Sequence, residues 1–149
     1  MSLNTSTTRR RWLASAIVLL GSGAPGCGIF GGGNQQTMRA SPNIPSSEGT
    51  VESSIDDNGN VRLIIEVTRL PHPSKVSPGA KVYAVWIQPG SAVLQNAGTL
   101  TVDDDMTGKL ETVTPYKTFQ LTVTPEVSPA GSRATQAPVF TADIDESDD

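Results

Sequence analysis

The apolar and polar residues from position 50 onward alternate with a period of two, which predicts short β-strands. The clearest alternation covers residues 61–70, and Asn58-Gly59 is typical of a tight hairpin turn that would join it to a weaker alternation at 50–55. Further strands are expected at residues 118–124 and 139–144, with Pro- and Gly-rich loops between the apolar runs.

Shorter segments complete the set of expected strands. Residues 90–98 fit a loop or a short strand, while residues 99–102 and 109–113 are expected to form a hairpin. Seven or eight short strands without a body helix predict an all-β, two-sheet antiparallel immunoglobulin-like β-sandwich over residues 49–144. The last residues, 145–149, are expected to form an acidic tail in solvent.

One stretch differs from the alternating pattern, because residues 82–87 are apolar at nearly every position. Such a run predicts a central strand that is buried on both faces. Its two large aromatic residues, Tyr83 and Trp86, have opposite parity and therefore point to opposite faces. We expect Trp86 to lie in the core and Tyr83 to lie on the outer face, where it would mark a possible contact surface.

Residues 1–26 have the three parts of an export signal peptide, namely a basic start, an apolar run and a stretch of small residues. The apolar run, residues 12–20, is too short for a transmembrane helix, which needs roughly 20 residues. The stretch from Thr8 to Leu13 includes Arg9 and Arg10 and resembles the twin-arginine export motif. An ordinary basic signal peptide remains the alternative.

The cysteine at position 27 follows Ala24-Pro25-Gly26, and this stretch resembles the lipobox of bacterial lipoproteins. The resemblance implies that the Cys27 thiol accepts a diacylglyceryl group and that cleavage makes Cys27 the new N-terminus. Two or three acyl chains would anchor the protein stably to a membrane. The alternative is a cysteine without a role. Residues 27–48, rich in Gly, Pro and small polar residues, are expected to form a flexible, lipid-anchored linker.

Charge narrows the range of partners. The formal net charge of the chain is −4, and removal of the three leader arginines leaves 8 basic against 15 acidic side chains, or −7. A domain with this charge has no electrostatic footprint for nucleic acid. It would also be repelled by anionic lipids, so membrane attachment is expected to come from the lipid anchor.

Few residues of the expected domain are candidates for catalysis or metal binding. His72 is the only histidine and lies in a Pro-rich loop, where an exposed side chain is expected. Two acidic clusters, Asp56-Asp57 and Asp103 to Asp105 with Glu111, lack the spacing of a known calcium loop and are expected at hairpin tips. We therefore expect no catalytic residue, no metal site and no cofactor.

Four stretches together carry a resemblance to known proteins: 83–89, 95–100, 108–115 and 119–126. They resemble uncharacterised exported proteins of soil bacteria and, more distantly, the extracytoplasmic β-sandwich domain of anti-sigma-K-type factors. The shared motifs are structural, and no catalytic residue is implied. Sigma-factor sequestration is not implied either, because this chain lacks the cytoplasmic domain and membrane helix that the factors use.

The sequence thus predicts a non-enzymatic, lipid-anchored extracytoplasmic module of the bacterial cell envelope, with a binding or structural role. Its partners would be a membrane, reached through the lipid, and an unidentified envelope protein. The alternative is an accessory sensory or regulatory domain in envelope signalling of the anti-sigma type.

Overall fold

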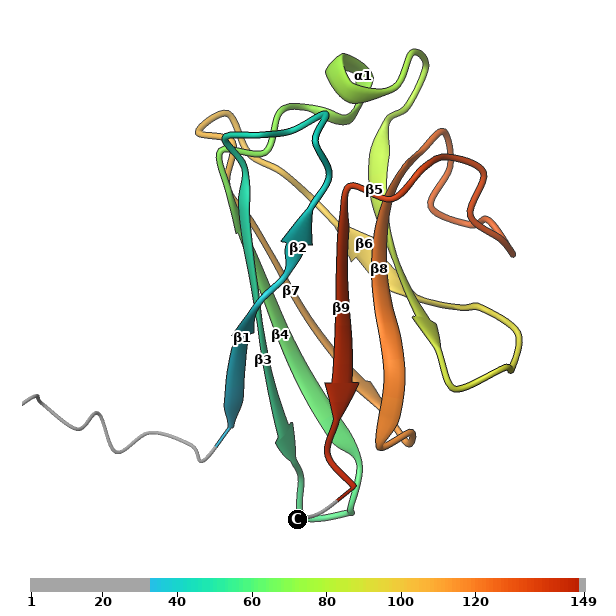
Figure 1. The fold of residues 1–149 in the computed structure, drawn as a ribbon. Helices are drawn as coiled ribbons and strands as arrows, with labels where there is room; N and C mark the ends of the chain where they lie inside the picture. The colour runs from blue at the N-terminus through green and yellow to red at the C-terminus, as the bar shows by residue number, and fades with distance from the viewer. Residues whose placement is uncertain (1–32, 148–149) are drawn as a thin grey trace, which may run out of the picture.

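The computed structural model describes residues 33–147, which form two antiparallel sheets packed face to face (Figure 1). The four-stranded sheet contains, in spatial order, β1 (Asn34–Thr37), β3 (Glu48–Ile55), β4 (Val61–Thr68) and β7 (Gly108–Thr114). The five-stranded sheet contains β2 (Arg39–Ala40), β9 (Phe140–Asp145), β8 (Thr118–Glu126), β5 (Val82–Gln88) and β6 (Gln95–Leu100). A four-residue helix, α1 (Pro73–Val76), lies between β4 and β5. No helix within residues 33–147 is long and apolar enough to cross a membrane.

This architecture confirms the predicted all-β, two-sheet antiparallel sandwich. The predicted hairpin is also present, since Ile55 pairs with Val61 across a turn in which Gly59 has a φ of 79°. In immunoglobulin domains the second and third strands lie in different sheets. Here β3 and β4 are neighbours in one sheet, so the likeness to immunoglobulin domains is one of architecture rather than strand order.

The segment expected to be a linker is part of the sandwich from residue 34 onward, and that prediction is wrong there. Residues 34–40 run along both sheets in turn, because β1 pairs with β3 and β2 pairs with β9. Met38, between them, is buried, and its amide donates to the carbonyl of Gly49 at 2.8 Å. Ile44 is also buried. All four side chains of β1 are polar and exposed. The sequence of β1 therefore lacks the alternation of apolar and polar residues from which a strand could be predicted.

The core lies between the inner faces of the sheets. Each fully buried large side chain contributes about 1.5–3 kcal/mol relative to an exposed one. Alternation in β4 and β8 places their apolar residues inward as predicted, and β5 lies between β8 and β6 as a central strand. The buried side chains of these three strands that form the core are Val61, Leu63, Ile65, Val67, Tyr83, Val85, Ile87, Phe119, Leu121 and Val123.

The two aromatic residues of β5 occupy faces that the sequence did not predict. Tyr83 is fully buried in the core between the sheets, and its hydroxyl donates to the carbonyl of Pro71 at 2.7 Å. The prediction of a contact surface at Tyr83 is therefore wrong. Trp86 is buried as expected, but on the outer face of the five-stranded sheet, beneath the β8–β9 loop. Because β5 is apolar at both parities, its sequence does not distinguish the two faces.

The predicted β6–β7 hairpin is also wrong, since the two strands belong to different sheets. In the described chain, a single antiparallel bridge joins Val102, two residues after β6, to Gly108 at the start of β7. The chain crosses between the sheets here, and a side-chain carbon at Gly108 would lie 2.7 Å from the carbonyl oxygen of Thr101. The crossing therefore depends on a glycine at this position.

The C-terminal acidic segment begins inside the fold rather than in solvent. Strand β9 extends to Asp145, and the carboxylate of Glu146 is buried. Both of its oxygens lie 3.2 Å from the side-chain nitrogen of Asn34, and one accepts a hydrogen bond from the hydroxyl of Ser53. The prediction of a solvated tail is thus wrong for Glu146, whereas Asp145 is the last residue of β9 and its side chain is exposed. The contact fixes the start of β1 to the end of β9.

Burial of Tyr83 predicts a loss of stability at alkaline pH. Desolvation raises the pKa of the Tyr83 phenol above its ordinary value of about 10. Above pH 10 the unfolded chain releases this proton while the folded chain keeps it, so the free energy of unfolding falls by up to about 1.4 kcal/mol per pH unit. Urea titrations between pH 8 and 11 should show this fall. Tyr83→Phe should flatten it, whereas Tyr116→Phe should not. An unchanged slope in Tyr83→Phe would contradict the assignment.

Candidate functional site

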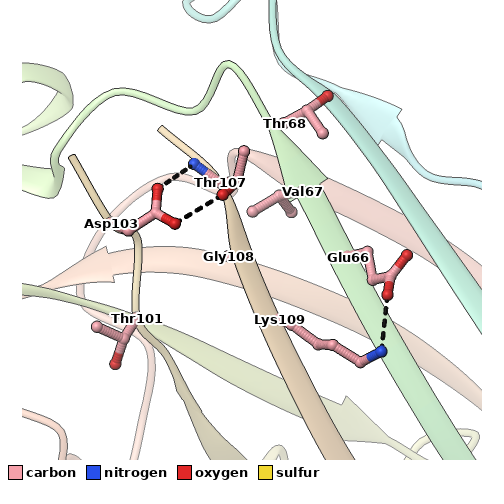
Figure 2. A pocket seen from close by; sticks show the side chains of 8 residues that line it. All are labelled: Glu66, Val67, Thr68, Thr101, Asp103, Thr107, Gly108 and Lys109. Atoms are coloured by element: carbon pink, nitrogen blue, oxygen red, sulfur yellow. Dashed lines mark hydrogen bonds and ion pairs between the residues drawn. The ribbon is translucent and has the colours of Figure 1, made fainter. Parts of the chain in front are cut away.

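An open pocket of about 410 Å³ lies where β4 ends and β7 begins (Figure 2). The end of β4 and the start of β7 form one side, and the β6–β7 connection forms the other. Figure 2 shows carboxylate, ammonium and hydroxyl groups around it. The lining residues are Glu66, Val67, Thr68, Thr101, Asp103, Thr107, Gly108 and Lys109.

The turn beside the pocket is shaped by Asp103. Its carboxylate accepts hydrogen bonds from the amide of Thr107 at 2.9 Å and from the Thr107 hydroxyl at 2.8 Å. These bonds, the amide bond first, lower the pKa of the Asp103 carboxyl below its ordinary value. Met106 in the same turn has a φ of 60°, a left-handed conformation that this side-chain cap holds in place.

Across the pocket, Glu66 and Lys109 are cross-strand partners in the β4–β7 register. The Lys109 ammonium lies 2.8 Å from the Glu66 carboxylate, and both side chains are half exposed. The hydrogen bond and the charge of Glu66 raise the pKa of Lys109. An exposed pair of this kind contributes little to stability, so both groups are free to exchange partners with a polar molecule.

The chemistry of this pocket suits reversible contact with a polar partner. The lining residues include neither histidine nor cysteine. The carboxylate of Asp103 is the one that lies near a hydroxyl of the lining, and it already accepts hydrogen bonds from Thr107. These bonds lower its pKa, which makes it a poor base. The sequence did not indicate this pocket, because the pairing of β7 with β4 only becomes apparent in the fold.

The two acidic clusters act as turn caps. Asp56 accepts from the amides of Asn58 and Asn60 at 2.9 Å each, and these bonds lower its pKa. Glu111 is not brought to Asp103 but pairs with Arg62 on β4. Residues 33–147 contain no group of three or more acidic, histidine or cysteine side chains that could hold a metal ion.

His72 is exposed in the β4–β5 connection, as predicted. Its Nδ1 lies 2.9 Å from the hydroxyl of Ser74 and accepts from the Ser74 amide at 3.4 Å, which caps α1. The predicted export residues Arg9 and Arg10 and the predicted lipid site Cys27 lie outside the described residues.

A buried polar network on the outer face of the five-stranded sheet was missed by sequence reasoning. The Trp86 indole donates to the Thr124 hydroxyl at 2.8 Å, and that hydroxyl donates to Glu126 at 2.7 Å. Thr135, in the β8–β9 loop, donates its amide to the same carboxylate at 2.9 Å and also donates its hydroxyl. The network therefore fastens the β8–β9 loop over Trp86.

The carboxylate of Glu126 is the centre of that network and is only 4% exposed. Burial alone would raise its pKa, but the hydrogen bonds from Thr135 and Thr124 outweigh burial, and the pKa is lowered. The alternating polar residues Thr122, Thr124 and Glu126 are typical of a face in contact with solvent, so the local pattern does not indicate that they are buried.

Comparison of the chain with known protein families and with curated protein sequences finds no match. The resemblance to the extracytoplasmic domain of anti-sigma-K-type factors therefore stays a prediction.

Loss of the Thr135 hydroxyl should loosen the loop over Trp86. Thr135→Val keeps the side-chain shape but removes one donor to a buried carboxylate, which should cost about 1.5 kcal/mol. Trp86 is the only tryptophan among residues 33–147, so its fluorescence in a urea titration of this domain reports both loop closure and unfolding. In Thr135→Val we expect the urea midpoint of unfolding to fall and the Trp86 emission of the folded protein to shift to longer wavelength.

A matched control is Ser132→Ala in the same loop, because this exposed residue makes none of the contacts of the network. It should leave both the midpoint and the emission unchanged. Equal behaviour of the Thr135 and Ser132 variants would contradict the role of the network.

Proposed function

We propose that the protein is a non-enzymatic, lipid-anchored extracytoplasmic module with a binding or structural role at a bacterial membrane. The observation that carries the proposal is the position of Cys27, the only cysteine, directly after an export-like leader. Six residues separate Cys27 from the first residue of β1. The leader, the lipidation site and the folded domain thus follow one another in the order that an anchored module requires.

The folded domain agrees with such a role. Its rigid two-sheet scaffold places exposed turns at both ends, and polar groups surround the pocket between β4 and β7. A scaffold of this kind presents loops and shallow pockets to partners without needing chemistry of its own. The net charge of −7 without the leader arginines disfavours adsorption to anionic lipids, so the lipid at Cys27 supplies the attachment.

The alternative, an accessory sensory or regulatory domain in envelope signalling, rests on the resemblance of residues 83–89 and the later stretches. In the fold, those first residues belong mainly to the buried strand β5. This first part of the resemblance is therefore carried by residues that pack the core, and it gives no independent support for a signalling partner.

Removal of the Cys27 thiol should abolish membrane attachment. In cells fed a fatty-acid analogue, we expect the full chain to be labelled and to sediment with membranes. Cys27→Ala should lose the label and appear in the soluble extracytoplasmic fraction, because the acyl acceptor is gone. Ser22→Ala, a change of similar size in the leader, serves as the control. Undiminished labelling of Cys27→Ala would rule out lipidation at this residue.

The export route is tested by a change that preserves charge. Replacing both Arg9 and Arg10 by Lys keeps a basic leader but removes the paired guanidinium groups of the twin-arginine motif. Export should then stop and the precursor should accumulate in the cytoplasm, as followed by fractionation and immunoblotting. Arg11→Lys changes a position that the motif leaves open and should be exported normally. Normal export of the double variant would favour the general route.

A further inference from the structure

The start of β1 lies near one end of the sandwich. Asn34 pairs with Ser53, and Ser53 pairs with Leu63, two residues from the β4 end that adjoins the β3–β4 turn. Because β1 runs away from this turn, the chain that precedes Asn34 enters from the same end. Figure 1 shows the β3–β4 turn and the end of β9 at this end, with α1 at the other.

The start of β1 is held to this end by side chains from distant strands. The buried carboxylate of Glu146 binds both Asn34 and Ser53. Gly33 packs so closely on β3 that a side-chain carbon there would lie 3.0 Å from the backbone carbonyl oxygen of Ser53. The point at which a tether would join the domain is therefore fixed near the β3–β4 turn.

Covalent geometry limits how far that point can be from the lipid. The seven steps from Cys27 to Asn34 span at most about 25 Å, whatever conformation the residues between them adopt. From the level of Asn34, β4 continues for five residues, or about 17 Å, to its far end, and α1 and the β6–β7 turn lie beyond. The tether is therefore only slightly longer than the distance from Asn34 to that far end, so it could barely bring the far end to the membrane.

We propose that the end formed by the β3–β4, β5–β6 and β7–β8 turns faces the lipid surface, and that the opposite end is displayed away from it. This orientation rests on the proposed lipid anchor at Cys27. It places the pocket between Glu66 and Asp103, together with α1, at the distal end, where a polar envelope partner can reach it.

The composition of the membrane-facing end fits this orientation. Val93, in the β5–β6 loop at that end, is 80% exposed, the highest value among the exposed large apolar side chains of the described chain. Asp57 and Asp145 at the same end are exposed acids, which oppose close adhesion to anionic lipid. The end therefore offers a point of apolar contact, and these two exposed acids outnumber Lys117, the base of the β7–β8 turn.

Two exposed turns at opposite ends provide a matched test of orientation. Asp57 in the β3–β4 turn and Asp104 in the β6–β7 turn are both exposed and lie at opposite ends, since Val61 pairs with Thr114 and Val67 with Gly108. Lipidation consumes the only native thiol, so Asp57→Cys and Asp104→Cys each introduce one reactive site. The charge change is the same in both variants.

The experiment uses the processed, lipidated full chain carrying a donor dye at one introduced cysteine. The protein is bound to phosphatidylcholine vesicles that contain a headgroup-labelled acceptor lipid, and energy transfer is measured. We expect several-fold stronger transfer from position 57 than from position 104. Equal or reversed transfer would overturn the orientation while leaving the anchor intact. Failure to bind vesicles would instead refute the anchor, and the orientation with it.

If either variant fails to fold, Ser91→Cys in the β5–β6 loop and Lys75→Cys in α1 give a second pair at the same two ends. The same inequality is expected, with stronger transfer from position 91 than from position 75. A reversed result for this pair would overturn the orientation equally.

Discussion

Burial of β5 on both faces is the constraint on which the rest of the fold depends. Tyr83 extends from one face into the core between the sheets, where its hydroxyl donates a hydrogen bond to the carbonyl of Pro71. The other carries Trp86, whose indole needs Thr124. A strand with large side chains on both faces requires a cover on each. The four-stranded sheet covers one face, and the β8–β9 loop, held by Glu126, covers the other.

The sequence predicted the elements for which burial and exposure alternate. Residues 61–68 have one face in the core and one in water, so their pattern identified both the strand and its inward face. The same reasoning fails for residues 34–37, whose side chains are all exposed and whose strand is defined only by backbone bonds to β3. It also fails for Tyr83, because β5 is apolar at both parities and the sequence does not distinguish one face from the other.

The buried carboxylate of Glu146 and the pocket could not be predicted for a different reason. Acidic residues are rarely buried unless they are paired. The partners of Glu146 are Asn34 and Ser53, which are far from it in the sequence. The pocket likewise needs the pairing of Glu66 with Lys109, which depends on β7 joining β4 rather than β6. Long-range register, rather than local pattern, decides both features.

The ordered start of the domain changes the picture of an envelope module on a long tether. Since the sandwich begins at residue 34, only six residues lie between it and Cys27, and the proposed lipid anchor would make the two ends of the domain inequivalent with respect to the membrane. Intact-mass spectrometry of protein extracted from membranes with detergent tests the central claim most directly. A chain that begins at Cys27 and carries a diacylglyceryl group would support the account. An unmodified chain, or one that begins at another residue, would contradict it.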